Sequence, residues 1–415
     1  MKLHHFILGM VCCLFLSCSD DDKQYELVNV ATPITITSAE LRASIEVQSP
    51  KSMVQSGKIY AYEQYIFIND VDKGVHIIDN RNPQQPTLVN FLKIPYNKDV
   101  SVKGNYLYAD SGKDLVVFDI SQVNNIQFVG HVENVLNVQQ TVDYPEGVDI
   151  YNLENYNYED IIIGWDIVVE QREIQDDNMY TIDLAEAASD GGGNTGSGGS
   201  LARFKIVDNY LYAVDINQIN VFDIQNLEAP VKVNEEYVTW ESETIFYQDN
   251  KLFIGSRTGM YIYDITNPSS PTFISSYDHM KFCDPVVVDG NYAYVTLRAG
   301  SSCMNGDFQT LESRLEIIDI SDIYNPQLVE TYFMDEPYGL GIKGEKLFIC
   351  DGASGLKVYN KQDISNLQLT QNFNTNEAYD VIPMQDKLLL IGGNTLTQYN
   401  YTATGIEVIS EFTIQ

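Results

Sequence analysis

The chain has few basic residues for its length. Its 415 residues contain 25 Lys and Arg against 58 Asp and Glu, which gives a formal net charge of −33. Proteins that bind a polyanion cluster Lys and Arg on one surface, and no basic patch is visible in this sequence, so nucleic acid is excluded as a partner. The acidic surplus suits a solvated surface at the cell exterior and the binding of cations.

Signatures of common catalytic sites are also missing. The sequence contains no His-Glu-x-x-His zinc motif, no serine nucleophile elbow and no glycine loop that would cradle a phosphate. There are five histidines, and those beyond the first 17 residues, His76, His131 and His279, are far apart in the sequence. We therefore do not expect a catalytic triad.

What the chain does have is one pattern that returns seven times. In Gly104–Ser121, two short runs of β-branched and aromatic residues flank a Ser-Gly turn and end at Asp119, which predicts a β-hairpin. The other copies close at Asp79, Asp223, Asp264, Asp319, Asn360 and Asn400. A period of about 40 residues is expected of a propeller blade, because one small sheet cannot bury both of its faces alone.

Each hairpin is preceded by one more short strand and followed by a turn, often marked by Pro, and a fourth strand. We therefore expect an all-β fold, a seven-bladed β-propeller with four-stranded blades, over residues 54–415. The strands of each blade are named A to D from the axis outwards. Two intervals between the closing residues of successive copies are longer than the rest, which predicts insertions at about 137–200 and 299–313. An eighth blade is the alternative for the first insertion, which contains the strand-like run Ile161–Val169, but no hairpin pattern with a closing Asp occurs there.

Two of these runs carry a resemblance to a known family. Leu115–Asp119 and Leu315–Asp319, together with the Asn-Pro-x-x-Pro turn that begins at Asn267, resemble the LVIVD repeat of bacterial β-propeller proteins. Several members of that family are cell-surface lipoproteins of unassigned role. The resemblance covers roughly residues 54–415, and it implies the fold but says little about function.

The N-terminus predicts export. Residues 1–17 combine an early Lys with a short apolar run, which is typical of a signal peptide rather than of a membrane span. Phe15-Leu-Ser-Cys18 resembles a lipobox, which implies a lipid on Cys18; a plain secretory signal is the alternative. Ser19–Asp22 resembles the acidic tag of surface-exported lipoproteins, or is a solvated tether. We expect an outer-membrane lipoprotein, exposed at the cell surface.

Residues 18–53 are expected to be an acidic tether and N-terminal segment. Pro33–Thr37 predicts a strand that adds to an outer edge and helps to close the ring. Ser38–Glu46 has helical spacing behind a Ser N-cap.

The cysteines left after removal of the signal peptide fit an exported protein. Cys283 begins an A strand and Cys303 lies in the B-to-C loop of the same blade, so both lie at one end of the propeller and a disulfide is expected. Recurrence of Cys283-Asp-Pro285 with a later Cys in relatives of the repeat family implies the same pairing. Cys350 lies in an apolar run and is expected to be a buried, unreactive thiol.

Carboxylates at the start of several A strands are the best candidates for a ligand site. Asp99, Glu243, Asp284 and Asp380 occupy equivalent places, where A strands converge on the axis and oxygen ligands could hold Ca²⁺. The alternative is that they are solvated or Arg-paired groups that cap strand ends. The closing aspartates are expected to bond the backbone of their own turns.

These features predict a binding module rather than an enzyme. A non-catalytic binding or scaffolding role for a protein or glycan partner is expected on the face from which both insertions leave. The alternative is a metal-assisted hydrolase or lyase that uses the axial carboxylates. Candidate partner-face residues are Trp165, Arg203, Trp240 and Arg298.

Overall fold

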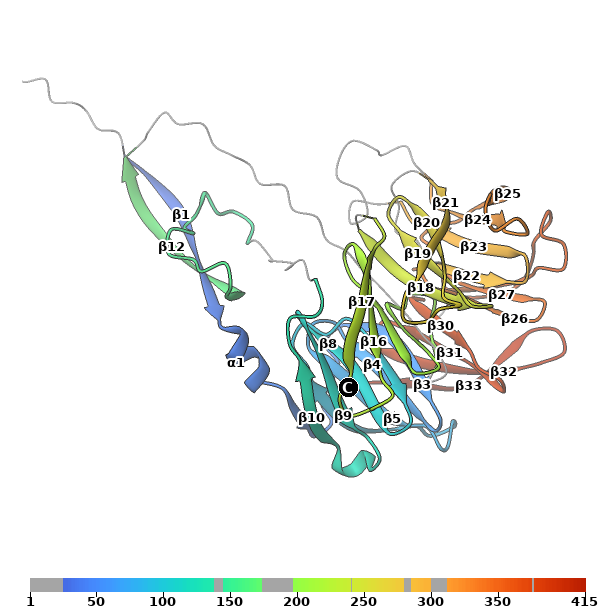
Figure 1. Ribbon diagram of the computed structural model, residues 1–415, viewed down its shortest axis with the longest axis horizontal. Helices are drawn as coiled ribbons and strands as arrows, with labels where there is room; N and C mark the ends of the chain where they lie inside the picture. Colours follow the sequence, from blue (N-terminus) through green and yellow to red (C-terminus); the bar gives the residue numbers. More distant parts are fainter. Residues whose placement is uncertain are drawn as a thin grey trace, which may run out of the picture. The chain divides into compact units, whose positions relative to one another are not determined.

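The computed structural model describes residues 25–137, 145–173, 197–239, 241–279, 285–299, 312–374 and 377–415 (Figure 1). The chain divides into two units. The smaller comprises residues up to 36 together with 142–183, and the larger comprises residues 37–141 and 184–415. Within the described residues, no helix is long and apolar enough to cross a membrane. The predicted signal peptide and Cys18 lie outside the described residues.

The larger unit consists of antiparallel sheets that follow one another along the chain. The first has six strands, in the order β13 (Ser197–Gly198), β3 (Ser56–Tyr62), β4 (Tyr65–Asp70), β5 (Gly74–Asp79), β6 (Thr87–Lys93) and β2 (Glu46–Gln48). Six sheets of four strands follow, listed here from strand A to strand D. They are β7–β10 (Val100–Lys103, Tyr106–Ser111, Asp114–Asp119, Gln127–Val132), β14–β17 (Phe204–Val207, Tyr210–Val214, Gln218–Asp223, Val231–Tyr237), β18–β21 (Ser242–Gln248, Lys251–Ser256, Gly259–Asp264, Thr272–Asp278), β22–β25 (Val286–Asp289, Tyr292–Leu297, Arg314–Asp319, Gln327–Phe333), β26–β29 (Leu340–Lys343, Lys346–Cys350, Leu356–Asn360, Gln368–Phe373) and β30–β33 (Asp380–Pro383, Lys387–Gly392, Thr395–Tyr401, Ile406–Thr413).

All seven predicted hairpins form the B and C strands of these sheets. In the second sheet, β8 pairs with β9 so that Leu107 lies opposite Phe118 and Tyr106 opposite Asp119. Gly112 takes a left-handed conformation in the connecting turn, with φ of 56°, which glycine adopts at no steric cost because it lacks a Cβ. The middle of both strands is buried, because alternate side chains face the two neighbouring sheets.

The closing aspartates bond the backbone of their own turns, as predicted. Asp119 Oδ1 accepts a hydrogen bond from the Ser121 N–H at 2.8 Å. The side-chain oxygens of five of the other six closing residues accept from the residue two positions later in the same way, namely Asp79, Asp223, Asp264, Asp319 and Asn360. These residues therefore stop the C strands.

The hydrophobic core lies between the sheets. Buried apolar residues form clusters that each join two consecutive sheets. A further cluster joins the last sheet to the first, with Leu389 and Ile391 of β31 against Ile59 and Ile66. The sheets thus succeed one another and meet again at the start, which makes the fold all-β and propeller-like.

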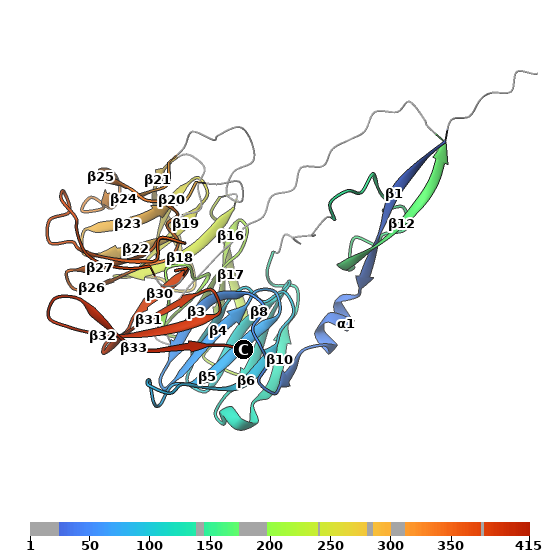
Figure 2. The same cartoon turned by 180° about the vertical axis from the view of Figure 1, so that it is seen from behind.

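Side chains close this joint without any exchange of strands. Asn80 donates to Gln398 at 3.0 Å, and Gln398 donates back to Asn80 at 2.7 Å. Ser410 Oγ donates to the Pro83 carbonyl at 2.6 Å. Figures 1 and 2 accordingly show β33 beside the first sheet. The last sheet takes all its strands from the end of the chain.

A strand from the N-terminal segment does add to an outer sheet edge, as predicted, but it is not the predicted strand. Pro33–Thr37 does not add to an outer edge, because most of it belongs to β1 (Tyr25–Ile36) in the smaller unit. Instead β2 pairs with the outer strand β6. The helix α1 (Ser38–Ala43) is capped by Thr37 rather than by Ser38, since Thr37 and Glu40 form a capping box.

In the smaller unit, β1 lies between β11 (Ile150–Tyr151) and β12 (Ile161–Glu173), parallel to the first and antiparallel to the second. The predicted strand at Ile161–Val169 is confirmed as part of β12. Among the described residues of the first insertion, no four-stranded sheet occurs, which agrees with an insertion rather than an eighth blade.

Candidate functional site

The A strands all begin at one end of the larger unit, and we call this end the insertion face. It carries the starts of β3, β7, β14, β18, β22, β26 and β30, together with the D-to-A and B-to-C connections. Both predicted insertions leave from it. Strand order alone produces this grouping, because successive strands of an antiparallel sheet alternate in direction.

Asp99, just before β7, joins the second sheet to the third. It is 3% exposed. Its Oδ2 accepts hydrogen bonds from the backbone N–H groups of Arg203 and Phe204, both at 2.9 Å, and its Oδ1 accepts from Val100 at 2.7 Å. The carboxylate thus satisfies backbone donors that start two neighbouring A strands.

Asp380 repeats this arrangement between the last sheet and the first. Its Oδ1 accepts from the Val381 N–H at 2.9 Å, and its Oδ2 from the Ile59 N–H at 3.4 Å. Burial raises the pKa of Asp380 to about 7, and the Asp99 charge adds to the increase. The two hydrogen bonds and the Lys58 charge act in the opposite direction but are outweighed. The charge of Asp99 therefore disfavours ionisation of Asp380.

The chain itself packs against the Asp380 carboxylate. Ser197 and Gly198 pair with Ala61 and Tyr60 on the inner edge of β3. A Cβ on Gly199 would lie 1.9 Å from Asp380 Oδ1, so no larger residue fits without movement. Ser200 Oγ then accepts a hydrogen bond from the Leu340 N–H at 2.8 Å. The end of the first insertion therefore lies beside the A strands of the first, sixth and seventh sheets.

Glu243, the third described candidate, has an arginine partner. Its Oε1 accepts from Arg257 Nε at 3.1 Å, and Arg257 also bonds Glu241 at 3.0 Å. Glu243 and Arg257 are each 3% exposed, so the pairing compensates charges that burial would otherwise penalise. Among the described residues no group of three or more His, Cys, Asp or Glu is placed to hold a metal ion. Asp284 lies outside the described residues.

The partner-face candidates fall in different places. The Arg298 guanidinium, in the B-to-C connection of the fifth sheet, lies 4.0 Å from the ring centroid of Tyr338, in the D-to-A connection before β26. Trp165 belongs to the smaller unit, where its ring contacts Tyr151 at 5.3 Å. Arg203 holds Asp99 through its backbone, while its buried Nε has no hydrogen-bond partner among the described residues.

Three other candidates, Trp240, Cys283 and Cys303, lie outside the described residues. Cys350 is confirmed as a buried residue, and burial raises the pKa of its thiol well above the ordinary value.

Sequence reasoning missed a second set of aspartates, at the ends of B strands. Asp110 Oδ1 accepts from the backbone of Lys98 and Asp99, both at 2.9 Å, so it fixes the connection that leads into β7. Buried aspartates near the ends of three other B strands also accept backbone hydrogen bonds from connecting segments, namely Asp70, Asp215 and Asp351. The signal was available, because Asp110, Asp215 and Asp351 directly follow the apolar runs of their hairpins and Asp70 follows one residue later.

Asp70 also contacts a fully buried histidine, His76, whose Nε2 lies 3.3 Å from Asp70 Oδ2. Burial acts to raise the pKa of Asp70, but the hydrogen bonds from His76, Gln55 and Val54 outweigh it and hold that pKa below its ordinary value.

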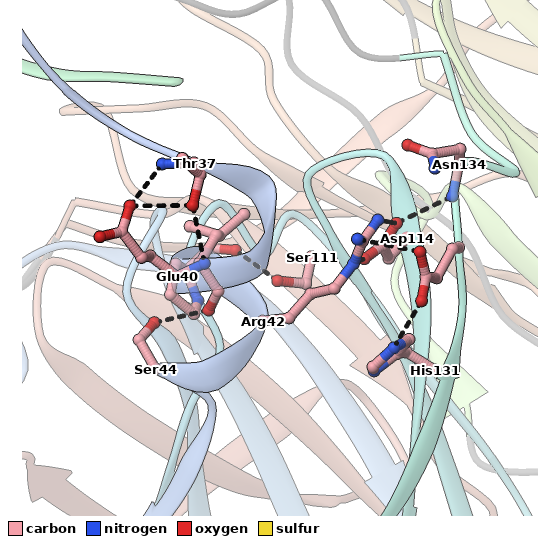
Figure 3. Close-up of polar contacts among 11 residues, drawn as sticks. Thr37, Glu40, Arg42, Ser44, Ser111, Asp114, His131 and Asn134 are labelled. Carbon is pink, nitrogen blue, oxygen red and sulfur yellow. Dashed lines mark hydrogen bonds and ion pairs between the residues drawn. The ribbon is translucent and has the colours of Figure 1, made fainter. Parts of the chain in front are cut away.

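A linker helix is fixed to the insertion face by ion pairs (Figure 3). Arg42 of α1 binds Asp114 in a bidentate arrangement, with Nε to Oδ2 at 2.5 Å and Nη2 to Oδ1 at 3.0 Å, and it reaches Glu133 at 2.9 Å. Asp114 also accepts from the Asn134 N–H at 2.8 Å. The helix at the start of the larger unit is therefore attached to the second sheet.

Comparison with known proteins gives the family. The LVIVD repeat matches residues 55–92, 96–134, 247–279, 283–301 and 312–333. The chain is an LVIVD-repeat protein. The first two matches coincide with the four central strands of the first sheet and with the whole second sheet. The third, sixth and seventh sheets of this LVIVD-repeat protein have the same strand order outside the matched residues.

Three solved structures resemble the chain at low identity, and one of them has a TM-score above 0.5. A protein from Lactobacillus plantarum has a TM-score of 0.53 and 11% identity, over 87% of this chain and 97% of that one. BamB from Moraxella catarrhalis has a TM-score of 0.48 and 9% identity, over 90% and 98%. Hsv2 of Kluyveromyces lactis has a TM-score of 0.48 and 10% identity, over 87% and 100%. No curated protein matches.

Proposed function

We propose that this LVIVD-repeat protein is an exported, lipid-anchored, seven-bladed propeller that binds a protein or glycan partner at its insertion face without catalysis. Apolar clusters between all neighbouring sheets, including the last and the first, support a closed ring of seven blades. The lipobox-like residues before Cys18 support the anchor, which would place the propeller at the outer membrane, exposed at the cell surface.

The carboxylates of the insertion face carry this proposal. Asp99 and Asp380 accept backbone hydrogen bonds from neighbouring sheets, and Glu243 is paired with Arg257. Groups used in this way hold the A strands in place and make the face rigid. A rigid frame with variable loops is the usual arrangement of a recognition surface.

The Arg298–Tyr338 stack is the described feature of this face that best fits a partner contact. Arg and Tyr are enriched among residues that dominate binding energy at interfaces. Both side chains are half-buried and come from connections of two neighbouring sheets. The stack holds the guanidinium in one place, so little conformational entropy is lost on binding.

Two experiments test the proposal. Cys18→Ala should abolish lipid labelling and release the protein from the membrane fraction; retention of both would contradict the anchor. For the binding face, the mature protein is screened on a glycan array and by cross-linking on cells. Arg298→Ala should weaken the signal about tenfold or more, whereas Arg81→Ala, in a C-to-D turn at the other end of the sheets, should not. Equal effects of the two substitutions would overturn the assignment of the face.

A further inference from the structure

Lys205 occupies a position where the other sheets have no charge. Each A strand has one residue opposite the third residue of its B strand, and for Lys205 that partner is Tyr212. The equivalent A-strand residues are Tyr60, Ser101, Phe246, Val287, Gly341 and Ile382. The fold therefore accepts aromatic, aliphatic or small residues here, and nothing in the blade architecture requires a lysine.

The surroundings of Lys205 are apolar. Tyr212 packs into the cluster between the third and fourth sheets, and directly opposed residues of an antiparallel pair share a face, so Lys205 is directed toward the fourth sheet. Its Nζ lies 5.6 Å from the ring centroid of Phe246 and 5.4 Å from that of Tyr247. Burial lowers the pKa of Lys205 to about 8.

The amine has no counter-charge. In the part of the chain that the structure describes, Lys205 makes no hydrogen bond or ion pair. The described contacts of its ammonium group are those with the two aromatic rings. Other lysines at the inner strands are bonded: Lys103 donates to Asn209, and Lys343 to the Met384 and Gln385 carbonyls. Lys205 is half-buried and its Nζ is not among the fully buried polar atoms, so an anion from solution can reach an ammonium that no described protein group neutralises.

We propose that Lys205 binds an oxyanion group, a carboxylate or a phosphate, of a small ligand whose apolar part rests on Phe246 and Tyr247. An ammonium group is a point-charge donor that suits such an anion. The two rings provide apolar surface next to the charge, as ligand sites commonly do. This site is independent of the partner proposed for the insertion face, because it requires only Lys205 and the two rings.

The test uses the mature full-length chain in a low-salt buffer, with acetate, inorganic phosphate and D-glucuronate as separate probes. Binding is measured by calorimetry and by NMR of the Lys205 side chain after reductive ¹³C-methylation. We expect saturable binding of at least one probe and a rise of about one unit in the pKa of Lys205, because an adjacent anion favours the charged amine. Binding of phosphate but not of acetate would identify the ligand group as a phosphate. Tighter binding of glucuronate than of acetate would identify the ligand as an acidic sugar.

Lys205→Met is the main variant and Lys343→Met its matched control. The first should weaken binding at least about tenfold, whereas the second should leave it within about twofold. Lys205→Met should not lower the melting temperature, since an unpaired charge is replaced by an apolar group of similar length; a clear decrease would assign Lys205 a structural role instead. Lys205→Gln, which removes the charge but keeps a polar group, provides the binding test if the Met variant does not fold. Absence of binding of all three probes to the wild type, or equal binding by the Lys205 variant, would overturn the proposal.

Discussion

The carboxylate of Asp380 accepts a hydrogen bond from the backbone N–H of Ile59 and so connects the last sheet to the first. Asp99 makes the same connection between the second sheet and the third, with two donors in place of one. Equivalent residues therefore serve one structural purpose in different surroundings. Asp380 is fully buried and contacts Gly199, and these differences predict different responses to substitution and to pH.

Asp380→Asn should make the protein less sensitive to pH. The pKa of Asp380 is about 7 in the folded state and about 3.9 in an unfolded chain, so the folded state binds an extra proton between these values. Wild-type stability therefore falls as pH rises from about 4 to 7. An Asn cannot ionise, and the variant should gain up to about 4 kcal/mol relative to wild type between pH 4 and 8. Urea unfolding of both proteins at pH 4 and at pH 8 measures the free energies of unfolding. If the difference between variant and wild type is the same at both pH values, the raised pKa of Asp380 is contradicted.

Asp99→Asn should destabilise the protein at every pH in that range. The Asp99 oxygens accept three backbone hydrogen bonds, and an amide offers only one oxygen, so its NH₂ group must face a backbone donor. Leaving a buried donor unsatisfied costs about 1–3 kcal/mol. Denaturant unfolding of Asp99→Asn and Asp380→Asn compares their free energies of unfolding. Equal losses of stability at each pH would show that the two carboxylates have the same structural role.

Arg42→Met should loosen the linker helix without unfolding the sheets. The bidentate Arg42–Asp114 pair is 18% and 5% exposed at its two side chains, so the coupling energy in a double-mutant cycle should reach about 1 kcal/mol. Amide exchange of residues 37–48 should become faster in the variant. The Asp79–Arg81 pair is the control, because Arg81 is 68% exposed and its coupling should be close to zero. A similar coupling in both pairs would contradict the anchoring role.

The sequence predicted the repeated parts of the fold well and the contacts between distant segments poorly. The hairpins and their closing aspartates follow from local alternation and turn chemistry, which act within about 20 residues. The pairing of β1 with β12 joins segments more than 100 residues apart, and no local pattern specifies such a partner. For the same reason, the equivalent places of Asp99 and Asp380 at the starts of A strands suggested that they could hold a cation, but no local pattern could show that they accept hydrogen bonds from backbone N–H groups of the next sheet.

Labelling of thiols tests the predicted Cys283–Cys303 disulfide together with the buried state of Cys350. Cys350 is fully buried and its thiol pKa is raised, so a thiol reagent should not react with the native protein, because the thiolate is the reactive form. After unfolding without reductant, a mature domain that lacks Cys18 should label at Cys350 alone if the disulfide is present, and at Cys283 and Cys303 as well if it is not. Cys350→Ser serves as the control and should then give no label. Reaction of native protein at Cys350 would show that the inner strand β27 opens in solution, in conflict with its place in the core.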